Sequence, residues 1–351
     1  MKKFFKIAGI ALLIILIFVI IVVIIGFLYI KGKLNKINYV EIDEEKLNIS
    51  GTAERNLEDY RNIVLLGLDN RIQDDNITYD NKGSRTDCII IASINKETND
   101  VKLISVYRDT FVDIDGYGLD NINNAYTYGG PELTIATLNK NFDLNIKEFV
   151  AVNFTAVAEM VDSVGGVEID ITSEELKYIN DYIKGLGKDS GLSSENINKS
   201  GLQTLNGVQA VAYSRIRYTD GGDYRRTERM RTVLLKVFEK LKNMSVSELN
   251  KIADDMLPEV YTNIKSDEIF KLVPEITKFN IVGSEGWPYA VDGVELEDGL
   301  WHGIPRTLES NVKLLHENTF NEENYEVNET IKSISERMKE VYDYEGAAAG
   351  T

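Results

Sequence analysis

Arginines concentrate in one short stretch of an otherwise acidic chain. The 351 residues include 39 Lys and Arg against 56 Asp and Glu, which gives a formal net charge of −17. Six of the thirteen arginines nevertheless fall within the eighteen residues from Ser214 to Arg231. Arginine keeps its charge at any relevant pH, and its planar guanidinium can hold a phosphate group through two hydrogen bonds at once. This stretch is therefore a candidate anion-binding element.

Periodicity within this stretch predicts a helix that turns one arginine inward. Asp223 follows two glycines and is placed as the N-cap of the helix. Arg226 lies one turn before an apolar stripe and continues it, whereas Arg225 and Arg229 fall off the stripe and are expected to be solvated. A solvated basic helix is the plainer interpretation, but an inward guanidinium at a helix N-terminus is better suited to holding an anion in an open pocket. The stripe consists of Met230, Val233, Leu234, Val237, Phe238, Leu241 and Met244.

Three aspartates stand at the boundaries of expected strands, and each lies within two residues of an arginine. They are Asp69, Asp87 and Asp109. A single aspartate at such a place is usually a turn former. Carboxylate oxygens are also the ligands that Mg²⁺ or Mn²⁺ takes, and arginines bind phosphate oxygens. The combination predicts a metal-assisted site for a phosphate or diphosphate, although Gly129 and Gly130 are too short a run to form a glycine-rich phosphate loop.

Composition excludes several other classes of protein. An acidic chain is a poor candidate for coating nucleic acid, because that binding depends on neutralising phosphates, so no nucleic-acid partner is expected. Cys88 is the only cysteine, which excludes an intrachain disulfide; it lies in an apolar run and is expected to be a buried, inert thiol. His302 and His316 are the only histidines, and neither has a metal-ligand spacing. Histidine-dependent triads and zinc sites are therefore excluded.

The two ends of the chain predict an anchored protein. Residues 7–30 carry no charge, and as a helix they would span ~36 Å, which is enough to cross a bilayer. No small-residue cleavage site follows them, so we predict an uncleaved transmembrane anchor behind a short cytoplasmic tail, 1–6. Polar residues 31–58 are expected to form an extracellular stalk, and the charged residues 326–351 a flexible tail. Flanking lysines are balanced, so the charges alone do not orient the span.

Between these ends, residues 59–325 predict one catalytic domain of the α/β class. Strands and helices are mixed along the chain, which favours a three-layer α/β/α domain with one mixed central sheet. Residues 183–204 are expected to be a mobile surface insertion, and 287–296 a hairpin. Strands are expected at 60–69, 87–94, 101–107, 167–171 and 279–282, and helices at 131–142, 154–164, 206–214, 246–256, 267–276 and 308–320.

The motifs, taken in order, resemble those of the LytR-CpsA-Psr family over residues 62–240. They are Asn62-Ile-Val-Leu-Leu-Gly-Leu-Asp-Asn-Arg, Ser84-Arg-Thr-Asp, Ser105-Val-Tyr-Arg-Asp-Thr, Asn121-Ile-Asn-Asn-Ala-Tyr-Thr-Tyr-Gly-Gly-Pro, Val161-Asp-Ser-Val-Gly-Gly-Val, Leu205-Asn-Gly-Val-Gln-Ala and Asp223-Tyr-Arg-Arg-Thr-Glu-Arg. The resemblance implies a membrane-tethered phosphotransferase, with its N-terminus in the cytoplasm and its catalytic domain on the extracellular face. Such an enzyme moves an anionic glycopolymer from an undecaprenyl-diphosphate carrier to peptidoglycan or another wall acceptor.

The resemblance also implies roles for individual residues. Asp69 and Asp87 correspond to ligands of Mg²⁺ or Mn²⁺. Asp109 corresponds to a base for the acceptor hydroxyl, and the neighbouring Arg108 is implied to be catalytic with it. The residues implied to bind the diphosphate are Arg71, Arg85, Arg108, Asn123, Arg215, Arg217 and Arg226. Two positions depart from the family pattern, since Asn121 stands where lysine is usual and Met230 where glutamine often stands, so the donor's identity stays open.

Three other functions compete with glycopolymer transfer. A lipid diphosphate phosphatase or pyrophosphatase would use the same site with water as the acceptor. A membrane-bound transcription attenuator is less well supported, because only six residues precede the predicted span and the large domain is acidic. A purely structural wall-binding module would leave the inward arginine unexplained. For glycopolymer transfer, the expected partners are the lipid-linked glycopolymer, peptidoglycan and membrane lipid.

Overall fold

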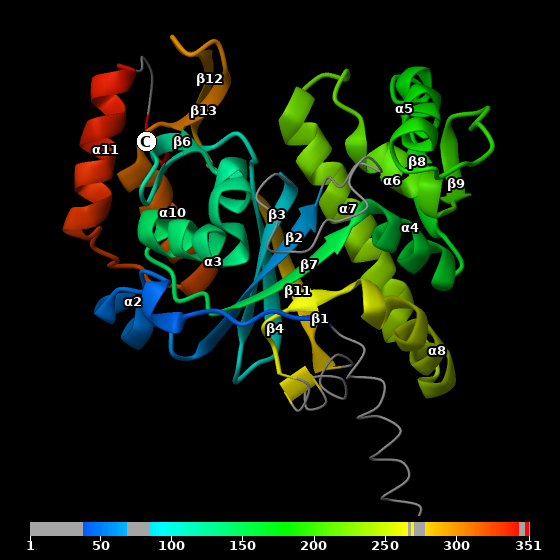
Figure 1. Cartoon of the computed structure of the whole chain (residues 1–351), viewed down its shortest axis with the longest axis horizontal. Coiled ribbons are helices and arrows are strands. Elements are labelled where there is room, and N and C mark those ends of the chain that lie inside the picture. Colours follow the sequence, from blue (N-terminus) through cyan, green and yellow to red (C-terminus); the bar gives the residue numbers. More distant parts are fainter. Residues whose placement is uncertain (1–37, 69–84, 266–267, 270–277, 344–347, 351) are drawn as a thin grey trace, which may run out of the picture.

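A computed structural model describes residues 38–68, 85–265, 268–269, 278–343 and 348–350. A sheet lies between two groups of helices, as the three-layer α/β expectation required (Figure 1). Asp69, Arg71, the predicted span 7–30 and the tail 1–6 lie outside the described residues. Within the described ranges, no helix has the length and apolar character needed to cross a membrane.

The central sheet is mixed and has seven strands in the order β1-β10-β7-β2-β3-β4-β11. β2 pairs in parallel with β7 and β4 with β11, while β3 runs antiparallel between β2 and β4, so the strands expected at 87–94 and 101–107 are confirmed and form a hairpin. The carboxyl ends of β2, β4, β7 and β11 therefore share one edge with the start of β3. The strands are β1 (Asn38–Tyr39), β2 (Tyr60–Leu68), β3 (Thr86–Asn95), β4 (Asp100–Val106), β7 (Glu148–Asn153), β10 (Tyr261–Thr262) and β11 (Asn280–Trp287).

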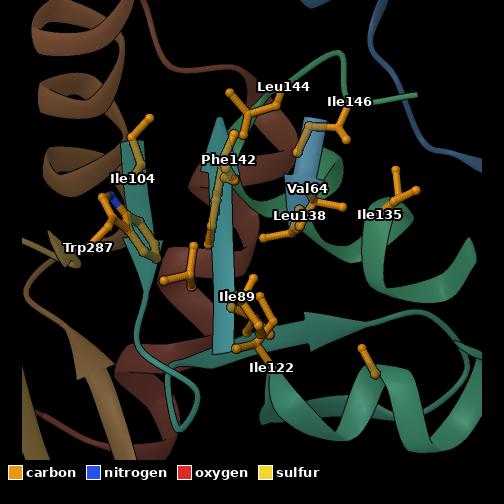
Figure 2. Packing of buried hydrophobic residues seen from close by; sticks show 14 of the residues in the cluster. Val64, Ile89, Ile104, Ile122, Ile135, Leu138, Phe142, Leu144, Ile146 and Trp287 are labelled. Carbon is orange, nitrogen blue, oxygen red and sulfur yellow. The ribbon is translucent and has the colours of Figure 1, made fainter. Parts of the chain in front are cut away.

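The larger apolar core fills the space between the sheet and one helical layer. Figure 2 shows aliphatic side chains from the sheet meeting Leu138 and Phe142 of α3, and the rings of Phe142 and Trp287 lie 3.9 Å apart between centroids. Burying such side chains contributes roughly 1.5–3 kcal/mol each. The helices of this layer are α2 (Gly51–Asn56), α3 (Asn123–Phe142), α10 (Leu308–Phe320) and α11 (Glu329–Val341).

The second group of helices lies on the other side of the sheet (Figure 1), and its buried residues form a second apolar cluster. Asparagine caps begin two of its helices: Asn153 accepts a hydrogen bond from the amide of Ala156, and Asn206 forms a capping box with Gln209. These caps explain why both helices begin where the sequence predicts. This layer contains α4 (Phe154–Ser163), α5 (Leu176–Asp189), α6 (Gly207–Arg215), α7 (Gly222–Lys242) and α8 (Val246–Met256).

Three two-stranded sheets and two short 3₁₀ helices complete the described fold. Among them, β13 bridges to Thr110 through Gly303, which places a hairpin beside the end of β4. The smaller elements are β5 (Phe111–Ile114) with β6 (Gly118–Asn121), β8 (Val167–Ile171) with β9 (Gly201–Leu205), β12 (Val291–Glu295) with β13 (Trp301–Pro305), η1 (Glu44–Lys46) and η2 (Leu257–Glu259).

The folded domain extends further along the chain than predicted, in both directions. The segment 326–351 is not wholly a flexible tail, because it contains α11, whose Ile331, Ile334 and Met338 are buried in the core. Likewise, much of 31–58 is not a stalk: β1 pairs with β10, and Leu57, the C-cap of α2, is buried. In both segments a few buried apolar residues are spaced among many charges.

Two internal predictions also need correction. Residues 183–204 do not form a loose insertion, since they contain the end of α5 and most of β9, and Asn180 holds Ile197 by two hydrogen bonds of 2.9 Å. The hairpin expected at 287–296 is instead made by β12 and β13. Most of the helix expected at 267–276 lies outside the described residues.

Candidate active site

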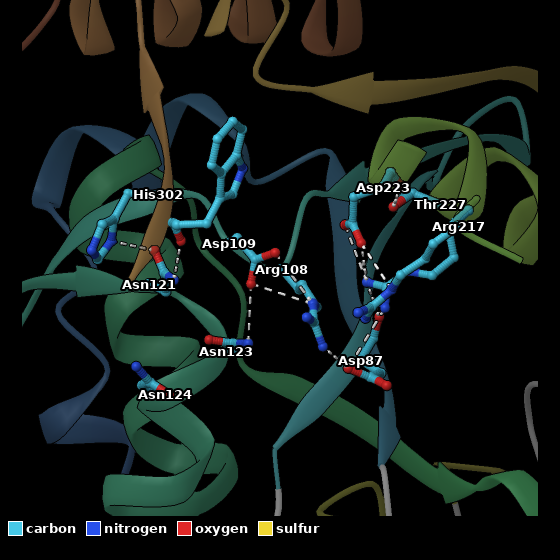
Figure 3. Close-up of polar contacts among 12 residues, drawn as sticks. Asp87, Arg108, Asp109, Asn121, Asn123, Asn124, Arg217, Asp223, Thr227 and His302 are labelled. Carbon is cyan, nitrogen blue, oxygen red and sulfur yellow. Dashed lines mark hydrogen bonds and ion pairs between the residues drawn. The ribbon is translucent and has the colours of Figure 1, made fainter. Parts of the chain in front are cut away.

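The predicted chemistry gathers at the sheet edge where β4 ends and β3 begins. Ile89 pairs with Val106, so the strand register brings Asp87 at the start of β3 beside Arg108, just after β4. The carboxyl ends of parallel strands are the usual place for a ligand in an open α/β sheet. The first turn of α7 approaches from the second helical layer and completes this arrangement (Figure 3).

An alternating network of aspartates and arginines lies at this edge (Figure 3). Arg108 Nη1 donates to Asp87 Oδ1 at 2.5 Å, and Arg108 Nε lies 3.3 Å from the Asp109 carboxylate. Asn123, which is buried, donates from Nδ2 to Asp109 Oδ1 at 3.5 Å. The structure therefore brings together Asp87, Arg108, Asp109 and Asn123 as the motifs predicted.

Asp223 is the site residue that the sequence analysis missed. It is not the N-cap of α7, which is Gly221; it lies in the first turn, where Arg217 Nε is 3.4 Å and Arg226 Nη2 3.1 Å from its carboxylate. Burial, together with the charge of Asp109, raises the pKa of Asp223 to about 6 despite the nearby arginines. The spacing of three residues from the inward Arg226 was the signal that could have identified it.

Arg226 is turned inward as predicted, but it does not face an open pocket. Its side chain is 2% exposed, and it lies 3.1 Å from Asp223 and 3.8 Å from Asp87. Its Nε is buried and has no hydrogen-bond partner among the described residues. Arg226 therefore holds two site carboxylates in place. Its guanidinium could bind a diphosphate only while it also contacts these carboxylates.

Arg229 is also buried, contrary to the expectation that it is solvated. It donates to Glu175 at 2.7 Å, to the carbonyl of Ile216 at 3.0 Å and to the hydroxyl of Thr219 at 2.7 Å. Its guanidinium thus fixes the loop between α6 and α7 against α5. Arg225, in contrast, is exposed and pairs with Glu228, as predicted.

Two predicted diphosphate ligands have neighbours outside this network. Arg85 is exposed, and its charge acts on Tyr128, a residue whose hydroxyl donates to Asp120 at 2.7 Å. The guanidinium of Arg215 lies over the ring of Phe154, 4.9 Å from its centroid. Their roles as diphosphate ligands remain predictions.

Comparison with known proteins assigns the family. The model of the LytR_cpsA_psr family matches residues 24–301. The chain belongs to this family. A curated relative is the "Polyisoprenyl-teichoic acid--peptidoglycan teichoic acid transferase TagU" of Bacillus cereus, which is 30% identical over 68% of this chain and 72% of its own length. The corresponding enzyme TagT of Bacillus subtilis is 30% identical over 66% of this chain and 70% of its length.

A solved LytR_cpsA_psr structure shares the fold. It is described as the family protein YwtF (TagT) with bound octaprenyl pyrophosphate lipid. The match has a TM-score of 0.54 and 23% identity, and it covers 76% of this chain and 92% of that one. The three-layer architecture is therefore that of the LytR_cpsA_psr family.

The two departures from the LytR_cpsA_psr pattern have different surroundings. Asn121 is buried and engaged with β13: its Nδ2 donates to the carbonyl of Trp301 at 2.9 Å, and its Oδ1 accepts from His302 at 2.7 Å. Met230 is buried on the apolar stripe of α7. Asn121 thus ties a hairpin to the site edge, a role that the sequence analysis did not foresee.

Of the two metal ligands that the LytR_cpsA_psr resemblance implies, the structure describes only Asp87. Asp87 supplies the hard oxygen donor that Mg²⁺ or Mn²⁺ takes, and its carboxylate contacts with Arg108 and Arg226 are both made by Oδ1. Asp69, the second expected ligand, lies outside the described residues. Within the described part of the chain, no three His, Cys, Asp or Glu side chains are grouped to hold a metal.

Proposed function

We propose that this protein transfers an anionic glycopolymer from an undecaprenyl-diphosphate-linked precursor to peptidoglycan by metal-assisted phosphotransfer. The observation that carries the proposal is the network in which Arg108, Arg217 and Arg226 meet three aspartates at one sheet edge. TagT and TagU are named polyisoprenyl-teichoic acid–peptidoglycan teichoic acid transferases, which supports the same substrate classes. The octaprenyl pyrophosphate in the TagT structure supports a lipid diphosphate donor.

In the proposed reaction, an acceptor hydroxyl attacks the phosphorus that carries the polymer. A new phosphodiester forms, the bond to the bridging oxygen breaks, and polyprenyl monophosphate leaves. Arg108 and Arg217 are placed to stabilise the charge that develops on the phosphate oxygens. A divalent ion held by Asp87, together with Asp69, would neutralise further charge on the diphosphate.

Two carboxylates are placed to take the proton of the acceptor hydroxyl. The family resemblance points to Asp109. Asp223 lines a cavity together with Asp109, and its pKa of about 6 lies closer to neutral pH, where a general base is most effective. We therefore propose Asp223 as the base and Asp109 as the group that orients the acceptor.

Reconstitution separates transfer from hydrolysis. Purified full-length protein in vesicles would receive a lipid-linked anionic polymer with or without peptidoglycan. Phosphodiester-linked polymer on peptidoglycan is the expected product, and release of polyprenyl monophosphate should be at least tenfold slower without acceptor. Equal release with and without acceptor, and no attached polymer, would establish the phosphatase instead.

Replacing Asp87 with asparagine is expected to weaken binding of Mn²⁺ at least tenfold and to abolish transfer, because an amide cannot replace the charged ligand. Binding would be followed by electron paramagnetic resonance of Mn²⁺, and folding by thermal melting. Asp100→Asn, at the opposite end of β4, is the matched control and should bind Mn²⁺ normally. Full transfer in the presence of EDTA would contradict the metal assignment.

The proposed location predicts that protease added outside protoplasts digests residues 31–351 and spares 1–6. The expectation rests on the uncharged residues 7–30, which are long enough to span a bilayer. Tags at the two ends of the chain, detected by immunoblotting, provide the measurement. Loss of the N-terminal tag with retention of the C-terminal one would reverse the proposed orientation.

A further inference from the structure

A cavity of about 350 Å³ adjoins the aspartate–arginine network. Its walls carry three aromatic rings, those of Tyr107, Tyr224 and Trp301, and two carboxylates, Asp109 and Asp223. Among the described residues that line it, none is lysine or arginine. The cavity is completed by Thr110, Gly221, Gly222, Val291 and Gly303.

Two glycines allow the aromatic walls to lie where they do. A methyl group at Gly293 would come within 2.2 Å of the Trp301 ring, so the indole packs directly on bare backbone. A methyl group at Gly286 would likewise meet the hydroxyl of Tyr107 at 2.2 Å. Trp301 remains 58% exposed, and its ring is therefore held in position while part of it stays free to contact a ligand.

The β12–β13 hairpin, which carries Trp301, is hydrogen-bonded to residues that follow the end of β4. The amide of Gly303 donates to the carbonyl of Asp109 at 2.7 Å, and Asn121 Nδ2 donates to the carbonyl of Trp301 at 2.9 Å. The second bond fixes the amide orientation, so His302 Nδ1 must donate to Asn121 Oδ1. The aromatic wall and the two carboxylates therefore form one preorganised surface.

The chemistry of this surface does not suit the anionic donor. A diphosphate or a polymer bearing phosphates would be repelled by two carboxylates and would be drawn to Arg108 and Arg217 instead. A neutral sugar ring fits both kinds of wall: its C–H face covers an aromatic ring, and its hydroxyls donate to carboxylates. The volume falls in the usual range for a small-ligand site.

We propose that this cavity is the acceptor subsite, in which a sugar ring of the wall glycan stacks on Trp301 and directs hydroxyls to Asp109 and Asp223. The inference rests on the proposed transfer reaction and adds the location and chemical class of its second substrate. The arginines then bind the donor on one side of the two aspartates, and the acceptor approaches from the other.

Fluorescence provides a direct binding test, because the chain has two tryptophans and Trp287 is fully buried. Quenching by acrylamide should therefore report on Trp301. Soluble peptidoglycan glycan strands, freed of their peptides, are expected to protect Trp301 from quenching at least twofold, whereas the anionic polymer without its lipid should not. Protection by the anionic polymer and none by the glycan would overturn the assignment.

Kinetics test the same subsite in the full-length protein. Trp301→Ala is expected to raise the KM for the glycan acceptor at least tenfold and to change the KM for the lipid-linked donor less than twofold. Leu300→Ala removes an adjacent side chain that is 50% exposed and does not line the cavity, so both KM values should stay unchanged. Equal effects on the two substrates, or none on the acceptor, would refute the subsite.

The two proposals can fail separately. A wild-type protein that transfers polymer, with Trp301→Ala indistinguishable from Leu300→Ala, would remove the subsite and leave the function. A wild-type protein that protects Trp301 in the presence of glycan strands but attaches no polymer would remove the transfer reaction and leave the glycan site.

Discussion

Replacing Arg226 with alanine is expected to lower the free energy of unfolding by about 3–5 kcal/mol, the cost of stranding the partners of a buried charge. Arg226 is almost fully buried, and its guanidinium contacts Asp223 and Asp87. Without it, both carboxylates keep their desolvation cost and lose an attractive partner. For a domain of this size, the melting temperature should fall on the order of 10 °C.

The matched control is the neighbouring arginine. Arg225 is exposed and forms an ion pair with the exposed Glu228, so Arg225→Ala should change stability by less than about 1 kcal/mol. Chemical denaturation of both variants without ligand provides the comparison. If Arg226→Ala melts like the control, Arg226 instead waits unpaired for its substrate, as the sequence analysis expected.

Asp223→Asn is expected to reduce the rate of transfer by roughly 10²–10⁴-fold, the usual contribution of a general base. The amide preserves the shape of the side chain but cannot accept the acceptor's proton. Asp220→Asn changes an exposed aspartate three residues earlier, so its transfer rate should match that of the wild type. A transfer rate in Asp223→Asn within twofold of wild type would leave Asp109 as the base.

The pH dependence of Asp223 gives a second, independent measurement. Because burial raises its pKa from about 3.8 to about 6, the folded protein binds this proton more tightly than the unfolded chain does. The contribution of Asp223 to stability is therefore present below pH 3.8 and declines as the pH rises through 6. Transfer should rise over the same window as the base ionises. Asp223→Asn should remove both changes from the pH profiles.

Strong local patterns predicted much of this fold. The helix expected at 308–320 matches α10 in both bounds, because Thr307 caps it and its apolar residues recur at helical spacing. The hairpin of β3 and β4 was predictable from two apolar runs and the polar turn between them. In this hairpin the start of β3 lies beside the end of β4. The proximity of Asp87 and Arg108 could therefore be predicted from the pairing of the two strands.

Residues whose partners are distant in sequence were harder to predict. Glu175, which pairs with Arg229, is 54 residues away, and helical periodicity alone placed that arginine in solvent. Asp223 was assigned by a local capping rule, whereas its carboxylate is held by Arg217 and Arg226. The packing of α11 against the core was not predicted, because its buried apolar residues, Ile331, Ile334 and Met338, are few among many charged residues. In each case a tertiary contact outweighed a local preference.

The pairing of β1 limits how far the site can lie from a membrane. β1 begins at Asn38, and only the seven residues 31–37 separate it from the predicted span 7–30; seven residues can reach roughly 25 Å at most. Asn38 lies opposite Tyr261, which lies opposite Ala151, two residues before β7 ends at the catalytic edge. The start of β3 is four strands further along that edge, roughly 20 Å away. A tether attached there would keep the proposed site within roughly 45 Å of the bilayer that residues 7–30 are predicted to span.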